Sequence, residues 1–176
     1  MQEECCFIDY YNSPIGKIAL GSDGQALVGL WFEGEKYYCD GYEKFEYKKD
    51  LQIFRETRKW LDIYFSGKEP NFIPKLKQKG SDFRQEVWDI LKSVPYGKTI
   101  TYGDIAKIIA KRRGVKRISA QAVGGAVGHN SISIIVPCHR VVGADKNLTG
   151  YAAGLNVKKY LLELERVDIS EYKSIK

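Results

Sequence analysis

The stretch TYGDIAKIIAKRRGVKRISAQAVGGAVGHN, residues 101–130, has the pattern of two short helices joined by a basic turn. The first helix is expected to begin near Thr101, whose hydroxyl can cap the first turn. The second is expected to begin at Ser119 and to end at Gly128 or Asn130, since glycine and asparagine favour the left-handed conformation that closes a helix. Two such helices in succession predict a helix-turn-helix.

The second of these helices, AQAVGGAVG (residues 120–128), consists almost entirely of small residues. Two glycines inside a helix each cost about 1 kcal/mol relative to alanine, so they need a reason. One reason is close packing against another helix. The other is a smooth face that lets the backbone approach DNA in the narrow minor groove, where little sequence can be read.

The charge of the chain supports the second reason. The net charge is +6, and it arises in the second half: residues 1–80 carry 12 Lys and Arg against 13 Asp and Glu, whereas residues 81–165 carry 13 against 7. The cations near the motif, opposed only by Asp104, are Lys98, Lys107, Lys111, Arg112, Arg113, Lys116 and Arg117. Such a cluster is a solvated loop in many proteins, but beside a helix-turn-helix it favours binding to phosphates.

A reactive thiol is suggested by VPCHRVV, residues 136–142, where Cys138 stands directly before His139. An ordinary thiol has a pKa near 8.5, so a nucleophilic cysteine needs a base beside it, and His139 is the obvious one. Adjacent residues of a regular strand point to opposite faces. Either an irregular turn therefore begins at Pro137, or a water molecule bridges the thiol and the imidazole.

The remaining cysteines carry no recognisable chemistry. Cys5, Cys6 and Cys39 form no CxxC pair and have no nearby histidine spacing, so neither a zinc site nor any other metal site is expected. The start of the chain, MQEECCFIDYYN, is acidic and unlike a signal peptide, and no apolar run is long enough to span a bilayer. We expect a cytoplasmic protein with no membrane contact, in which a structural disulfide is not favoured.

The first half reads as a separate domain. Turn signals divide FIDYYNSPIGKIALGSDGQALVGLWF (residues 7–32) into three antiparallel strands, and residues 50–70 have the periodicity of an amphipathic helix. Residues 71–80 are expected to be a linker, and SDFRQEVWDILKSVPYG (residues 81–97) a further helix. The fold class is therefore α+β: a small N-terminal α/β domain with an antiparallel sheet over residues 1–75, and a C-terminal helical domain over residues 81–168 that contains the helix-turn-helix and the cysteine.

The second half closely resembles a known family. IIVPCHRVVG, preceded by AVGGAVGHN and followed by LTGYAAGLNVKKYLLELE, resembles the O6-alkylguanine-DNA alkyltransferases. The resemblance runs from about residue 83 to 165 and, more weakly, through the first half, which it implies to be a ribonuclease-H-like supporting domain. It implies a monomer that needs no cofactor and binds double-stranded DNA containing alkylated guanine. The alkyl group would pass irreversibly to the protein, after the base has been rotated out of the helix.

The resemblance also implies the roles of five catalytic residues. Cys138 would be the nucleophile, and His139 would be its base through a bridging water molecule, the arrangement that the family pattern favours. Glu165 would be the carboxylate that polarises His139. Asn130 would hold the turn between the second helix of the motif and the cysteine segment. Tyr102 would assist rotation of the nucleotide and donate a proton toward N3 of guanine.

Four residues besides Cys138 would shape the base pocket by the same resemblance. The carbonyls of Cys138 and Val141 would accept from the guanine amino group, the amide of Ala152 would face O6, and Tyr151 would flank the base. Val127 would complete the substrate-binding set. Which alkyl groups are accepted, and whether O4-alkylthymine is one of the substrates, is left open by the sequence.

The residues expected to contact DNA are Arg117, Gln121, Ala122, Gly124, Gly125 and Arg140. Gln121 is a departure, because many family members have at this position an arginine that fills the gap left by the rotated base. Gln121 is shorter and neutral, so replacing it with arginine is expected to strengthen DNA binding.

Two other classes of function compete with this interpretation. One is a helix-turn-helix regulator in which Cys138 is only a redox-sensitive residue. The other is a thiol transferase that acts without nucleic acid, which the basic motif disfavours. A related lesion-sensing group that resembles the family lacks the cysteine, so the presence of Cys138 excludes it.

Overall fold

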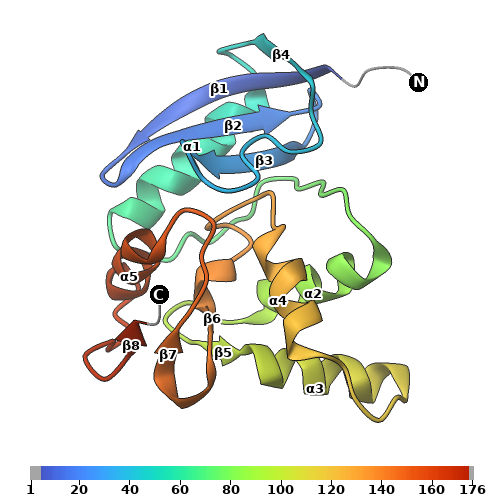
Figure 1. The fold of residues 1–176 in the computed structure, drawn as a ribbon. Coiled ribbons are helices and arrows are strands. Elements are labelled where there is room, and N and C mark those ends of the chain that lie inside the picture. Colours follow the sequence, from blue (N-terminus) through green and yellow to red (C-terminus); the bar gives the residue numbers. More distant parts are fainter. Residues whose placement is uncertain (1–4, 175–176) are drawn as a thin grey trace. The chain divides into compact units, whose positions relative to one another are not determined.

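The computed structural model describes residues 5–174 and divides into two compact units. Unit 1 comprises Met1–Lys79 and Ser131–Ser133, and unit 2 comprises Gly80–Asn130 and Ile134–Lys176. Both units, and the labels used below, can be followed in Figure 1. Residues 1–4, with which the expected first domain begins, lie outside the described residues. That residues 1–75 and 81–168 behave as separate domains stays a prediction.

Unit 1 is built on a four-stranded sheet of order β3-β2-β1-β4. The expected antiparallel meander is present as β1 (Cys5–Ser13), β2 (Gly16–Ser22) and β3 (Leu27–Phe32). The fourth strand, β4 (Lys44–Tyr47), pairs in parallel with β1 and was not anticipated. Its four residues, KFEY, are mostly exposed and lack the apolar alternation that identifies a strand in sequence.

A single helix, α1 (Gln52–Phe65), packs on this sheet. Its apolar face repeats every three to four residues and is formed by Ile53, Phe54, Thr57, Trp60, Leu61 and Tyr64. Two polar contacts fix the helix on β1: Arg58 forms an ion pair with Asp9, and the Tyr11 hydroxyl donates to Asp62 at 2.7 Å.

The expected linker, residues 71–80, is only partly a linker. The Leu27 amide donates to the Lys75 carbonyl at 2.8 Å, and the Lys77 amide donates to the Leu27 carbonyl at 2.9 Å, so this segment lies against β3. Residues 131–133 also pair with β3, through a parallel bridge between Leu30 and Ile132. The polar composition of residues 71–80 indicated a loop, but backbone hydrogen bonding to a sheet edge does not require apolar side chains.

Unit 2 contains the other helices and four very short strands. The helices are α2 (Asp82–Ser93), α3 (Tyr102–Arg113), α4 (Ala120–Gly128) and α5 (Leu155–Leu164). The strands are β5 (Ile100–Thr101), β6 (Val141–Val142), β7 (Asn147–Leu148) and β8 (Lys173–Ser174). β5 pairs with β6, and β7 pairs with β8, both in parallel.

The sequence predicted the starts of α2, α3 and α4 because each of these helices is capped by a side chain. Ser81, Thr101 and Ser119 accept from the amides of the third residue of their helices, and Thr101 forms a full capping box with Asp104. The helices α2, α3 and α4 pack on one another, and Trp88 of α2 is buried at their centre, where its indole donates to the Ala126 carbonyl at 2.8 Å.

Candidate active site

The helix-turn-helix is formed by α3 and α4, as the sequence predicted. All seven cations identified around it are exposed. Of these, Arg113 pairs with Glu86 at 2.9 Å. Arg117, Gln121 and Ala122, which we expected to contact DNA, are also exposed. The motif therefore presents an exposed group of positive charges. We call it the basic surface and define it as the seven cations from Lys98 to Arg117.

The glycines of α4 are not required for packing. A Cβ atom built at Gly125 or Gly128 finds no neighbouring atom within 4 Å, and one built at Gly124 meets only the Tyr102 ring at 3.9 Å, an ordinary contact. Close helix packing, the alternative reason for these residues, is therefore not supported. The glycines leave a smooth, accessible backbone on one side of α4.

The segment that carries Cys138 is a tight turn, not a strand. Residues Cys138–Arg140 form a single 3₁₀ turn in which the Arg140 amide donates to the Pro137 carbonyl at 3.0 Å. Of the two arrangements left open by the sequence, the irregular turn after Pro137 is present. Cys138 is buried, with only 6% of the residue exposed.

Asn130 holds this turn from behind. Its side-chain amide donates to the Val136 carbonyl at 2.7 Å, two residues before the cysteine, and both groups are buried. Its own backbone amide donates to Val127 at the end of α4. Asn130 therefore joins α4 to the cysteine segment, the position that the family resemblance implied.

His139 is fully buried, and its Nε2 atom lies 2.6 Å from Oε1 of Glu165. Glu165 is 2% exposed and directly follows α5, so these two residues, 26 positions apart, meet only in the folded chain. An ionised carboxylate can only accept hydrogen bonds, which requires Nε2 to carry the proton. A neutral ring then keeps its lone pair on Nδ1, the atom that can act as a base.

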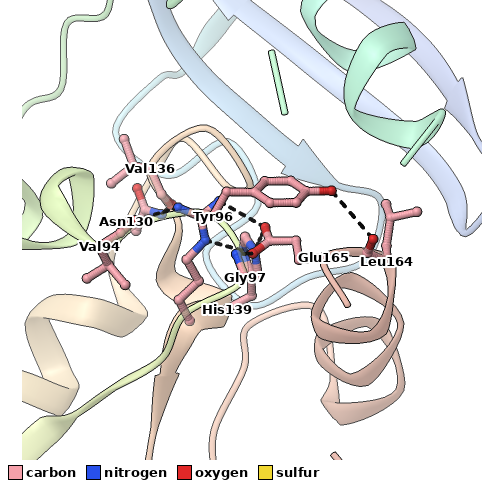
Figure 2. Close-up of polar contacts among 9 residues, drawn as sticks. Val94, Tyr96, Gly97, Asn130, Val136, His139, Leu164 and Glu165 are labelled. Carbon is pink, nitrogen blue, oxygen red and sulfur yellow. Dashed lines mark hydrogen bonds and ion pairs between the residues drawn. The ribbon is translucent and has the colours of Figure 1, made fainter. Parts of the chain in front are cut away.

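Figure 2 shows His139 and Gly97 beside the Glu165 side chain. Arg140 completes the same cluster. Its Nε and Nη2 atoms donate to the two oxygens of Glu165 at 2.9 and 3.0 Å, and its Nη1 atom donates to the Val94 carbonyl at 2.6 Å. The residue is only 9% exposed, and its guanidinium lies over the Tyr96 ring. This placement argues against the expected DNA contact, because the charge that would meet a phosphate is committed to Glu165.

The backbone around Glu165 fixes its carboxylate. Arg166 has a φ of 63°, its amide donates to the Glu163 carbonyl, and the Val167 amide donates to the Leu162 carbonyl. This pair of hydrogen bonds is a Schellman motif, which ends α5 at a defined residue. The Gly97 amide adds a further hydrogen bond to Oε2 of Glu165 at 3.1 Å.

The protonation states follow from burial and charge. Burial lowers the pKa of His139, which outweighs the opposite effect of Glu165, so the imidazole is neutral at neutral pH. Burial alone would raise the pKa of Glu165, but the hydrogen bonds and charges of His139 and Arg140 lower it to about 2. Burial, and then the charge of Cys138, raise the pKa of Tyr102, so its hydroxyl keeps its proton.

Lys158 is a site residue that the sequence analysis missed. It is fully buried, and its ammonium donates to three carbonyls: Val141 at 2.5 Å, Thr149 at 3.1 Å and Gly150 at 3.3 Å. Burial lowers the pKa of Lys158 to about 8, against the opposing influence of Cys138. The sequence does contain a signal for the burial of Lys158. Residue 158 lies three and four positions before the buried leucines of α5, and therefore on the same face of the helix.

Two of the site residues expected from the sequence, Tyr102 and Val141, lie beside this ammonium. The Tyr102 hydroxyl donates to the Thr149 carbonyl at 3.2 Å, the same oxygen that Lys158 contacts. Val141 is buried and offers its carbonyl to Lys158, while Tyr151 and Ala152 follow Thr149 and are half-buried. Val127, at the end of α4, is buried. The structure thus joins Tyr102, Val141 and the 149–152 loop, which we call the substrate loop.

No group of three or more His, Cys, Asp and Glu residues within residues 5–174 could hold a metal ion. No helix in this range has the length and apolar character needed to cross a membrane.

Comparison with known proteins gives consistent matches over both units. The family model for the 6-O-methylguanine DNA methyltransferase DNA binding domain matches residues 82–167, and that for the ribonuclease-like domain matches residues 7–77. The methylated-DNA–protein-cysteine methyltransferase of Haemophilus influenzae is 40% identical over 92% of this chain and 87% of its own length. That of Methanosarcina barkeri is 44% identical over 90% and 96%. Mycobacterium tuberculosis OGT, solved in complex with DNA, superposes with a TM-score of 0.76 at 38% identity, covering 91% of this chain and 92% of that one.

Proposed function

The chain belongs to the methylated-DNA–protein-cysteine methyltransferase family, and on that premise we propose that it repairs DNA by transferring the alkyl group of O6-alkylguanine to its own Cys138. The observation that carries the assignment of the reactive residue is the buried hydrogen bond of 2.6 Å between His139 and Glu165, directly beside Cys138 in the chain. It gives the cysteine a neutral, oriented base.

The transfer is a nucleophilic substitution at the alkyl carbon. Nδ1 of His139 takes the thiol proton, directly or through a water molecule, and Glu165 stabilises the imidazolium that results. The Cys138 sulfur attacks the carbon bound to O6, the carbon–sulfur bond forms, and the carbon–oxygen bond breaks. The electron pair stays on guanine, which takes up a proton from Tyr102 and leaves as ordinary guanine. The product is a thioether, which has no leaving group for a second turnover, so each protein molecule acts once.

Arg140 and Lys158 would serve this reaction as positioning residues. Arg140 holds both oxygens of Glu165, so that the carboxylate stays ionised and aligned with His139. Lys158 fixes the carbonyls of Val141, Thr149 and Gly150 around the pocket, and its charge lies close enough to affect Cys138. Its positive charge would favour the thiolate over the thiol.

DNA is the partner that supplies the substrate. The basic surface would neutralise backbone phosphates, while the glycine face of α4 enters the minor groove and Gln121 occupies the space of the rotated base. The base must leave the duplex because the thiol is buried and cannot reach a stacked guanine. We further propose that the protein works as a monomer in the cytoplasm, without a cofactor.

A regulator with a merely redox-sensitive cysteine is the weaker alternative. A sensor thiol is expected to be accessible to oxidants. Cys138, in contrast, is buried, and the next residue in the chain is His139, a base oriented by Glu165. The buried arrangement is better suited to a substrate that is inserted into the pocket.

The test is intact mass spectrometry after mixing the protein with a duplex that contains one O6-methylguanine. We expect the mass to rise by one methyl group in place of one hydrogen, mapped to the peptide that contains Cys138. The control is Cys138→Ser, which should bind the same duplex and gain no mass. Intact binding without a mass gain in the unaltered protein would refute transfer and favour the regulator.

A further inference from the structure

The chain continues past α5 and packs back against β7 and its neighbours. We call residues 167–174 the C-terminal strap. The strap ends with β8, which pairs in parallel with β7. Glu171 of the strap also forms an ion pair with Lys146, just before β7. None of the catalytic roles proposed above involves this segment.

The strap packs through three side chains. Val167, Ile169 and Tyr172 are half-buried against a small core cluster formed by Val142, Leu148 and Leu162. The Tyr172 hydroxyl lies 3.3 Å from the hydroxyl of Thr99. The strap is therefore held by apolar contacts, strand pairing and polar contacts together.

The core residues under the strap are direct neighbours of the pocket. Val142 follows Val141, whose carbonyl receives the Lys158 ammonium. Leu148 precedes Thr149, whose carbonyl receives both Lys158 and Tyr102. A shift of either core residue would move a pocket carbonyl, since adjacent Cα atoms are separated by a fixed distance of about 3.8 Å.

The turn between these two residues needs outside support. Asp145 and Lys146 have φ values of 55° and 56°, so two successive non-glycine residues adopt the left-handed conformation. This conformation costs about 1–2 kcal/mol per residue and persists only where surrounding contacts enforce it. The Gly143 amide, which donates to the Asn147 carbonyl at 2.7 Å, closes the turn from within. From the strap, the pairing of β7 with β8 is the main added contact, and the exposed ion pair of Lys146 with Glu171 is a minor one.

We propose that the C-terminal strap sets the position of the substrate loop and thereby determines which alkyl groups the pocket accepts. This inference rests on the proposed function of Cys138. A firmly held loop places a methyl group accurately against the sulfur but leaves little room for a larger group. A loosened loop admits larger groups and aligns the small one poorly.

The experiment compares single-turnover rate constants for two duplexes, one with O6-methylguanine and one with O6-benzylguanine. Three variants are compared with the full chain: a truncation after Val167, Tyr172→Ala, and the matched control Lys173→Ala, at the exposed next residue. The burst amplitude reports the fraction of active protein, so the ratio of the two rate constants is unaffected by partial unfolding.

We expect the truncation to slow methyl transfer about tenfold, which corresponds to about 1.4 kcal/mol. The benzyl-to-methyl ratio should rise at least about threefold, and Tyr172→Ala should change it in the same direction while Lys173→Ala leaves it unchanged. A ratio in the truncated protein within twofold of that of the full chain would overturn the proposal, whatever the individual rates. No transfer to Cys138 by the full chain would instead refute the proposed function itself.

Discussion

Two groups of charges in unit 2 differ in almost every physical respect. The basic surface consists of seven exposed cations, of which Arg113 forms an exposed ion pair with Glu86. The buried charged cluster consists of His139, Arg140, Lys158 and Glu165, each almost completely removed from solvent. In the first group charge faces water, and in the second each charged side chain meets named partners at hydrogen-bond distance.

This difference determines at which of these positions a charged side chain can be replaced without loss of the fold. An exposed ion pair contributes little to stability because water and salt screen it. A buried charge that loses its partner is costly because the remaining charge cannot be solvated. The basic surface should therefore be modified step by step with gradual loss of DNA affinity, whereas each member of the buried cluster should be individually necessary.

The largest expected effect comes from making the same substitution in both groups. Arg140→Met leaves the Glu165 carboxylate buried without its cation, and we expect a loss of about 3–5 kcal/mol in the free energy of unfolding. Arg113→Met removes an exposed pair and should cost at most about 1 kcal/mol. Urea unfolding measures both values.

DNA binding at several salt concentrations adds an independent readout. Arg113→Met should reduce the slope of log affinity against log salt by about one, as expected for a lost phosphate contact. Arg140→Met should leave the slope unchanged wherever the protein stays folded. A reduced slope with unaltered stability would return Arg140 to the DNA-binding role first expected from the sequence.

The second prediction concerns two adjacent lysines of α5. Lys158→Met keeps much of the side-chain volume but removes a charged donor from three carbonyls, and charged hydrogen bonds contribute about 1.5–3 kcal/mol. We expect the rate constant for methyl transfer to fall about 10- to 100-fold. Lys159→Met, in the half-buried neighbouring residue, should change it less than about twofold.

A pH profile distinguishes a role in the reaction from a role in folding alone. Since the pKa of Lys158 is about 8, its charge disappears above that pH, and the unaltered protein should lose the corresponding contribution to the rate there. This alkaline dependence should be absent from Lys158→Met and present in Lys159→Met. Equal profiles for both variants would show that the charge of Lys158 has no part in transfer.

The same contrast explains what the sequence could predict. Helices with side-chain caps at Ser81, Thr101 and Ser119 were predictable because each signal lies within four residues of its effect. Arg140 was assigned to DNA because its partners are 25 and 46 positions away, and nothing local reveals them. Lys158 was missed because it is adjacent to another lysine, and two adjacent lysines in a helix are typical of an exposed surface.

The pairing of His139 with Glu165 came from the family resemblance and not from local pattern. Read by itself, Glu165 is an ordinary polar residue at a helix end. Its burial depends on His139, Arg140 and the Gly97 amide, which the fold brings to it from two separate segments. Long-range desolvation of this kind leaves no periodic trace in the sequence.

The third prediction uses pH to measure the buried cluster. The folded pKa of His139 lies below its ordinary value of 6.5, so the unfolded chain binds a proton first as the pH falls, and stability is lost below pH 6.5. The folded pKa of Glu165, about 2 against an ordinary 4.5, makes its stabilisation disappear as the pH falls through that lower interval. Each proton corresponds to about 1.4 kcal/mol per pH unit.

Two histidine variants isolate the upper part of this dependence. His139→Gln retains a donor for Glu165 but cannot be protonated, so its free energy of unfolding should be nearly independent of pH just below 6.5. His129→Gln, outside the buried cluster, should keep the dependence of the unaltered protein. The prediction fails if both variants show the same slope in urea titrations at half-unit pH steps.

The smallest expected effect returns to the exposed side of the comparison, where stability and binding should change in opposite directions. Gly125 is exposed within α4, and a Cβ atom there meets nothing within 4 Å. Gly125→Ala should therefore stabilise the fold by about 0.5–1 kcal/mol through helix propensity. The added methyl group stands on the smooth face that we assign to the minor groove, so the affinity for duplex DNA should fall. Thermal unfolding and fluorescence anisotropy measure the two quantities on the same sample. A stabilised variant with unchanged affinity would mean that the glycines of α4 do not lie against DNA, and that the basic surface alone carries the binding.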